Sequence, residues 1–386
     1  TSFANPSREP GVWSLDEVDI VTVHRYGPQS FADIAGSIAQ LVGGKWSEYG
    51  KPVIVEEFAS DWRWFNKPLY YEDREGIEIH NGAWSAIMAG SPATAMLWWW
   101  DNYVHPYKLY SHYAALTAFL RGVDPYSSAL EELKGEPILP GDLEEYLGSL
   151  TIYPSLGWAR PMASVFEVTL SGEVGNKSQL SYFIQGRAHP ELRNSPVFRA
   201  TFPHGGRVAV RVNSVAKSGA VLAVYVDDSL ALEEKLPDLD GRDEAFADEY
   251  DLKVVVEVPP GTHTIKLDNL GDDWLTMDYV RLEGAVVKQA KTRILGLTNG
   301  TFAIVWIQNR DSTWWNAVHG IAVEPIGDLR IALYGLEDGD YLVEFWDPYR
   351  GAVIAEERCR AMGGRLVVSV KLLQRDLAVK AYRLGP

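Results

Sequence analysis

The 386-residue sequence contains a single cysteine, Cys359, and no apolar run that approaches the ~18 residues needed to cross a bilayer. One cysteine excludes an intramolecular disulfide framework and a cluster of thiolate metal ligands. Positive charge is scarce as well, because 36 Lys and Arg stand against 52 Asp and Glu, for a formal net charge of −16. A polyphosphate would repel such a chain, which carries no basic block. We therefore expect neither nucleic acid as a partner nor a membrane span.

Tryptophan is abundant, in contrast to cysteine and positive charge. The sequence has 14 Trp and 19 Tyr, and eight of the Trp fall within the first 100 residues. An indole ring combines a large apolar face with a polar edge, which suits stacking on a sugar ring as well as core packing. Composition alone leaves both roles open. The length exceeds what one compact core usually holds, so we expect two or three domains.

The hydrophobic pattern divides the chain into an α/β part and an all-β part. Residues 1–125 alternate apolar strands near 18–23, 51–58 and 93–100 with helical patterns over 31–42, 78–88 and 113–120, which predicts a parallel α/β sheet. Turn and proline signals over 126–159 predict a linker. Regularly spaced strands then predict two β-sandwiches of jelly-roll type, over 160–286 and 287–386.

Functional residue types stand at the end of each predicted parallel strand. These residues are His24 and Tyr26, Glu56 and Glu57, and Trp98 and Trp100. Because the carboxyl ends of parallel strands meet at one edge, we expect a functional site there. Strand alternation puts Glu56 and Glu57 on opposite faces but does not say which one enters the site. By the same alternation His24 and Tyr26 share a face, as do Trp98 and Trp100.

Four segments of this part resemble a known enzyme family: 18–26, 51–58, 80–84 and 97–103. They are similar to strands six, seven and eight of the clan A retaining glycoside hydrolases, and within that clan to family 5 β-mannanases and cellulases. The resemblance covers residues 1 to about 125. It implies that these residues are the C-terminal part of a (β/α)8 TIM barrel, strands 6–8.

The resemblance also implies a function, a retaining endo-β-glycosidase that hydrolyses a β-1,4-linked polysaccharide, cellulose or mannan, outside the cell. Glu57 would be the nucleophile of a double displacement, His24 and Tyr26 would border it, and Trp98 or Trp100 would lie under the sugar, with Trp98 favoured. Retention requires two carboxyl groups about 5–5.5 Å apart. The family's acid/base follows an Asn, and this sequence contains no Asn-Glu dipeptide.

A complete barrel needs eight strands and about 250 residues. The chain begins Thr1-Ser2-Phe3-Ala4, without an initiator Met. We therefore expect an N-terminal segment with strands one to five and the acid/base, either as a separate chain or as a cleaved part of a precursor. The alternative is a non-catalytic carbohydrate-binding or scaffold protein with a degenerate barrel.

Residues 160–286 carry a second resemblance, through the segments 261–269 and 271–279. They are similar to family 35 carbohydrate-binding modules, which implies an exposed aromatic at the sugar site and a structural calcium. Trp274 is the candidate stacking residue, although a packing role is equally open. Asp278 is a candidate calcium ligand, although the pattern favours an ordinary surface carboxylate, and the acidic stretch 238–249 is expected to be a solvated loop and not a metal site. We expect no cofactor for catalysis.

Overall fold

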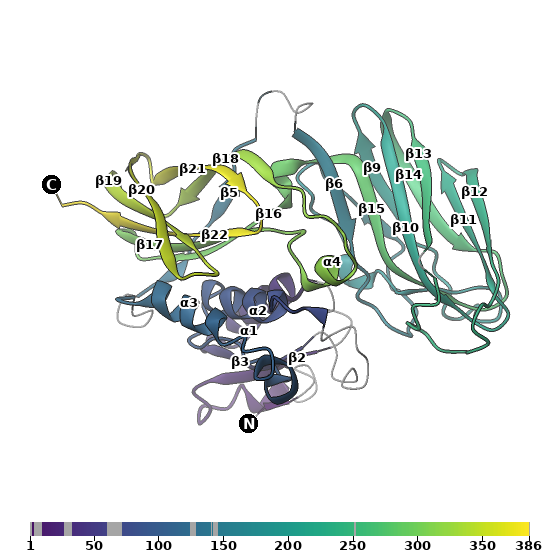
Figure 1. The fold of residues 1–386 in the computed structure, drawn as a ribbon, viewed down its shortest axis with the longest axis horizontal. Coiled ribbons are helices and arrows are strands. Elements are labelled where there is room, and N and C mark those ends of the chain that lie inside the picture. Colours follow the sequence, from purple (N-terminus) through teal and green to yellow (C-terminus); the bar gives the residue numbers. More distant parts are fainter. Residues whose placement is uncertain are drawn as a thin grey trace. The chain divides into compact units, whose positions relative to one another are not determined.

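The computed structural model describes residues 2–3, 10–26, 33–59, 72–123, 129–139, 141, 146–250 and 252–385. The chain forms two compact units, and Figure 1 shows that strands dominate both. Unit 1 combines Thr1–Leu139 with Thr292–Pro386, whereas unit 2 is Pro140–Lys291. No helix in the described ranges is long and apolar enough to cross a membrane.

Unit 1 begins with a small parallel sheet of three strands in the order β1-β2-β3. The strands are β1 (Ser2–Phe3), β2 (Val21–Arg25) and β3 (Val53–Phe58). The connection from β2 to β3 includes α1 (Ile34–Tyr49), which the Asp33 side chain caps by accepting a hydrogen bond from the Gly36 amide. The valines of β2 and β3 are fully buried. The first two predicted strands and the helix between them are therefore confirmed.

The third predicted strand, over 93–100, is wrong. Only an isolated parallel bridge between Leu97 and Phe58 extends the sheet at this point. The chain then enters a π-helical turn over Trp100–Val104, followed by α3 (Ser111–Leu120). A short apolar run does not distinguish a strand from another partly buried segment, which is why the pattern was misleading here.

Helix α2 (Ile77–Met88) joins the two halves of unit 1 and is buried along all twelve of its residues. One side lies against β3, where Gly82 lets the Phe58 ring approach so closely that an added Cβ would be 2.3 Å from it. The opposite side shares a buried cluster with Trp306 of the C-terminal part. His80 Nε2 lies 2.6 Å from Asp376 Oδ2, and Asn81 Nδ2 donates to the Ser312 carbonyl. The helix is therefore covered on both faces.

The C-terminal part of unit 1 is a sandwich of two antiparallel sheets, with strand orders β20-β19-β22-β17-β16-β4 and β21-β18-β5. Their inner faces enclose a core that includes Ile331, Val343 and Val368. A short helix, α4 (Trp314–Val318), follows β17. The strands are β4 (Glu131–Glu132), β5 (Gly135–Pro137), β16 (Thr292–Thr298), β17 (Phe302–Asn309), β18 (Ile326–Tyr334), β19 (Gly339–Asp347), β20 (Ala352–Ala361), β21 (Arg365–Leu373) and β22 (Asp376–Arg383).

Unit 2 is a second sandwich. One sheet has the order β13-β10-β15-β6, with β8 also paired to β15, and the other has the order β12-β11-β14-β9-β7. Phe198, Val210, Leu267 and Leu282 are among the fully buried core residues. The strands are β6 (Leu147–Ile152), β7 (Val165–Glu167), β8 (Phe183–Ile184), β9 (Val197–Phe202), β10 (Gly206–Val215), β11 (Ala220–Val226), β12 (Ser229–Leu236), β13 (Leu252–Val258), β14 (Gly261–Asn269) and β15 (Leu275–Val287).

The prediction that residues 1–125 are strands 6–8 of a (β/α)8 barrel is wrong. In the described residues the parallel strands form an open three-stranded sheet, and most of the structure is antiparallel β. The outer helices of a barrel surround a closed ring of strands, whereas α2 lies between the small sheet and a sandwich. The predicted N-terminal barrel partner loses its basis together with the barrel. The predicted linker, 126–159, contributes β4 and β5 to unit 1 and β6 to unit 2.

Candidate functional site

Three of the predicted site residues meet at the carboxyl ends of β2 and β3. A shift in register after Val23 pairs His24 with Glu57 instead of Glu56. The Tyr26 hydroxyl donates a hydrogen bond of 2.7 Å to Glu57 Oε2, and His24 Nδ1 lies 3.0 Å from the same oxygen. The two strands thus bring a carboxylate, an imidazole and a phenol together, and we call this group the Glu57 cluster.

The Glu57 cluster is partly shielded from water. His24 is only 9% exposed, whereas the Glu57 side chain retains 29% of its accessible surface. Burial, reinforced by the hydrogen bond and the charge of Glu57, raises the pKa of Tyr26 well above its ordinary value of 10. Tyr26 therefore remains a neutral hydrogen-bond donor at physiological pH. Glu57 is accessible to a ligand while two neighbours fix its orientation.

Glu56 also lies close to His24, with its Oε1 3.9 Å from His24 Nε2. Simple alternation along β3 predicted that one of the two glutamates would turn away from the site. The register shift between β2 and β3 instead lets one imidazole approach both carboxylates through its two nitrogens. This irregularity depends on strand pairing, so the sequence pattern gave no sign of it.

Two exposed tryptophans follow β3 along the chain. The Trp98 amide donates to the carbonyl of Phe58, the residue after Glu57, and this bond fixes the Trp98 backbone beside the end of β3. Trp98 is 44% exposed and Trp100 is 57% exposed, whereas Trp99 between them is buried. Trp100 begins a π-helical turn, so the strand face that the sequence predicted for the two residues is not formed, but both indoles offer apolar surface to a ligand.

Trp274, the predicted stacking residue of the 160–286 segment, is only 6% exposed. Its ring packs edge-to-face against Phe183, with 5.7 Å between centroids. The structure thus favours the packing role that the sequence had left open. A buried indole does not offer a face to a sugar.

Asp278 does not fit the calcium role that was predicted for it. Its Oδ2 lies 3.0 Å from Arg211 Nε, and its Oδ1 accepts a hydrogen bond from Asn213 Nδ2. Both oxygens already face donors, and calcium requires several free oxygen ligands. Burial raises the pKa of Asp278 from its ordinary 3.8 to about 7, although the charge of Arg211 opposes the shift.

The acidic stretch 238–249 brings three carboxylates together. In the described residues, the ligand atoms of Asp238, Asp240 and Glu249 lie within 4.8 Å of one another. Both oxygens of Glu249 already accept hydrogen bonds, from the amides of Val215 and Leu239, so Glu249 meets the same objection as Asp278. Structural calcium in this segment stays a prediction, and these three carboxylates are the group among the described residues that could hold the ion.

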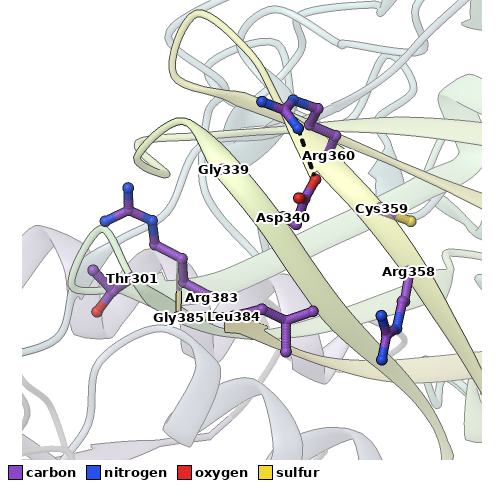
Figure 2. Close-up of a pocket in the computed structure, with 9 residues that line it drawn as sticks. All are labelled: Thr301, Gly339, Asp340, Arg358, Cys359, Arg360, Arg383, Leu384 and Gly385. Carbon is purple, nitrogen blue, oxygen red and sulfur yellow. Dashed lines mark hydrogen bonds and ion pairs between the residues drawn. The ribbon is translucent and has the colours of Figure 1, made fainter.

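A shallow hollow of about 860 Å³ lies on the C-terminal sandwich, where three arginines line it. Figure 2 shows that the Arg358, Arg360 and Arg383 guanidinium groups point away from one another. Arg360 pairs with Asp340 at 3.1 Å, and Arg383 pairs with Glu337. Because the charged groups do not converge and two of them are neutralised, the Glu57 cluster is the better candidate site.

Comparisons with known proteins give structural likenesses at low sequence identity. No protein-family model and no curated protein matches the sequence. A family 35 carbohydrate-binding module from an environmental isolate is 15% identical over 41% of this chain and 89% of its own, with a TM-score of 0.19. The C-terminal CBM6 of LamC, a marine laminarinase from Zobellia galactanivorans, is 15% identical over 35% of this chain and 98% of its own, with a TM-score of 0.22.

A larger structure is similar over more of the chain. It is a cycloisomaltooligosaccharide glucanotransferase from Paenibacillus sp., 11% identical over 92% of this chain and 66% of its own, with a TM-score of 0.21. The resemblance of residues 1–125 to a piece of a clan A glycoside hydrolase is wrong, because the described residues form an open sheet of three strands and the chain is mostly β. The shared strand-end residues reflect a local βα pattern.

Proposed function

We propose that this chain is a carbohydrate-binding protein and that the Glu57 cluster, with Trp98 and Trp100, is its saccharide site. The observation that supports this proposal is that Trp98, an exposed indole, is tied through its backbone to the end of β3, where Tyr26 and His24 hold the Glu57 carboxylate in place. An indole face covers the C–H face of a pyranose ring, while carboxylate and imidazole groups hydrogen-bond to its hydroxyls. Sugar sites combine an apolar lining with a few oriented polar groups in this way.

The charge of the chain favours a neutral ligand. With a formal net charge of −16, the protein would repel an acidic polysaccharide, and the site itself carries Glu56 and Glu57. Within the described part, the contacts of Glu57 are made through Oε2, which leaves Oε1 for a sugar hydroxyl. The ligand class that these charges favour is a neutral polysaccharide, and the proposal names β-1,4-glucan and β-1,4-mannan as the polymers to test. The proposed location is extracellular, where such polymers occur.

Binding of soluble polysaccharides by the purified full chain tests this proposal. Hydroxyethyl cellulose and galactomannan serve as probes in affinity gel electrophoresis. Trp98→Ala and Trp100→Ala each remove a stacking surface, so we expect affinity to fall on the order of tenfold. Trp46→Ala is the matched control, because Trp46 is 49% exposed but lies on α1. Equal affinities for all three variants and the wild type would refute the proposed site.

A second candidate function is hydrolysis of the bound β-glycoside, and the geometry of Glu57 favours it. The carboxylate at the end of β3 is oriented by a phenol and an imidazole and is still partly exposed. An oriented carboxylate of this kind can attack an anomeric carbon in a double displacement, provided that a second carboxyl group lies within reach of the leaving oxygen. We assign no residue to the second role.

Glu57→Gln separates binding from hydrolysis, because the amide keeps the shape of the side chain and removes the nucleophile. Release of reducing ends from β-1,4-glucan and β-1,4-mannan measures turnover, and gel retardation measures binding. If the chain is a hydrolase, the wild type releases products and Glu57→Gln still binds but releases almost none. Retention of polymer by the wild type with no products leaves the binding function alone.

A further inference from the structure

Unit 2 contains a chain of aromatic rings that ends at its surface. Buried Trp274 packs against Phe183, and Phe183 packs edge-to-face against Trp158, with 4.9 Å between centroids. On its other side Trp158 meets the His189 ring, also edge-to-face, with 5.0 Å between centroids. Trp158 itself is 50% exposed. Two neighbouring rings thus hold a large indole in place while half of its surface meets solvent.

The loops beneath Trp158 are tied together by backbone hydrogen bonds. The amides of Arg187 and Ala188 donate to the carbonyls of Gly271 and Asp272, at 3.2 and 2.6 Å. The side-chain amide of Asn269 donates to the carbonyls of Ile184 and Asp273. Three of these bonds, from Arg187, from Ala188 and from Asn269 to Ile184, join segment 184–189 to segment 269–274, so the base of the aromatic platform is held on both sides.

Gly186 shows how closely the two loops approach. A Cβ at this position would lie 2.4 Å from the Asp273 carbonyl oxygen and 2.6 Å from that of Gly271. Only glycine allows this contact without displacing backbone. A rigid base lowers the entropy lost when a ligand binds, which is a property of preorganised sites.

Polar groups lie next to His189, the ring that contacts the indole. His189 Nε2 lies 3.0 Å from Asp273 Oδ1, and its Nδ1 lies 3.7 Å from Glu191 Oε1. Arg187 pairs with Asp272 at 3.0 Å, although both side chains remain about two-thirds exposed, at 67% and 69%. The platform therefore presents one apolar ring beside donors and acceptors that stay accessible to water.

We propose that Trp158, with His189 and Asp273, forms a second saccharide-binding site, located entirely in unit 2. A pyranose ring would stack on the indole, while its hydroxyls would bond to Asp273, His189 and the Arg187–Asp272 pair. The site shares its ligand class with the proposed function but uses none of the same residues. Trp274 supports the platform from inside through its contact with Phe183.

The experiment starts from a full chain in which Trp98→Ala and Trp100→Ala have disabled the first site. Cellohexaose and mannohexaose are the probes, and isothermal titration measures affinity. We expect this background to retain binding and the addition of Trp158→Ala to weaken it at least tenfold. Trp158→Phe should recover part of the affinity, because a smaller ring can still stack. Trp46→Ala in the same background is the control for exposed indoles.

Hydrogen exchange provides a second readout, which does not depend on a variant that folds. Saturating hexasaccharide should increase protection of peptides that cover 184–189 and 270–274 of the wild-type chain. Unchanged affinity in the Trp158→Ala variant, or unchanged exchange in both loops, would overturn the second site. If Trp98→Ala and Trp100→Ala have no effect while Trp158→Ala abolishes binding, the site at Glu57 fails and the Trp158 site stands.

Discussion

Asp278 links the stability of unit 2 to pH at the level of a single residue. Its side chain is 4% exposed, and burial raises its pKa from 3.8 to about 7. Between these two pH values the folded state holds a proton that the unfolded state has released. The contribution of Asp278 to the free energy of unfolding therefore falls as pH rises from 3.8 towards about 7.

The prediction is that the unfolding temperature of unit 2 decreases across this pH range and that Asp278→Asn flattens the decrease. Asparagine keeps the shape of the side chain and its hydrogen bond with Asn213 but has no proton to release. Scanning calorimetry of the full chain at several pH values measures the slope for both proteins. An identical slope in the variant would show that the pH dependence arises from other groups. Because Asp278→Asn also removes the carboxylate that faces Arg211, the slope is the informative quantity and not the absolute temperature.

Two helical glycines, Gly82 in α2 and Gly43 in α1, test how closely each helix packs against its neighbours. Gly82 in α2 lies against Phe58, whose ring is fully buried, so Gly82→Ala should destabilise unit 1 by about 1–3 kcal/mol through overpacking. Gly43 in α1 has nothing within 4 Å of an added Cβ. Gly43→Ala should therefore stabilise unit 1 by about 0.5–1 kcal/mol, because alanine loses less backbone entropy in a helix.

Urea unfolding, followed by circular dichroism, measures both changes. The two substitutions add the same methyl group to a helical glycine, so their opposite signs isolate the effect of the neighbouring ring. If Gly82→Ala were neutral or stabilising, α2 would not lie as close to β3 as the structure places it.

Comparison of the predicted and observed elements shows which features of the fold can be predicted from the sequence. Periodicity correctly predicted β2, α1, β3 and α2, because each depends on residues that are near in sequence. It also brought His24, Tyr26 and Glu57 to one edge, since the carboxyl ends of adjacent parallel strands coincide. The barrel was predicted wrongly because sheet closure depends on how many strands pair, and local periodicity carries no such information.

Burial of α2 on all sides does not follow from its sequence. Glu78, Asn81 and Ser85 recur at the spacing i, i+3 and i+7, which is typical of an exposed polar stripe, yet all three are buried in the structure. The identity of its second partner depends on residues more than 200 positions away, such as Trp306 and Asp376. The contact of His24 with both glutamates and the exposure of Trp158 likewise depend on pairings that only the folded chain shows.

At the scale of the whole molecule, unit 1 is assembled from both ends of the sequence, while unit 2 comes from the middle. Trp306 is fully buried in the cluster that joins α2 and α3 to the C-terminal sandwich, and its Nε1 donates to Asp376 Oδ2. Trp306→Ala should therefore lower the free energy of unfolding of unit 1 by about 3–5 kcal/mol, the usual loss when a buried tryptophan is truncated.

The location of that loss distinguishes one cooperative unit from two separate domains. If Thr1–Leu139 and Thr292–Pro386 unfold together, Trp306→Ala should lower hydrogen-exchange protection in peptides of β3 and α2 as much as in peptides of β17 and β22. Peptides of β10 and β15 in unit 2 should keep their wild-type protection and serve as the internal control. Loss of protection confined to the sandwich would mean that the α/β part folds independently of it. Equal loss in both parts would mean that the Glu57 cluster depends for its stability on a tryptophan about 250 residues further along the chain.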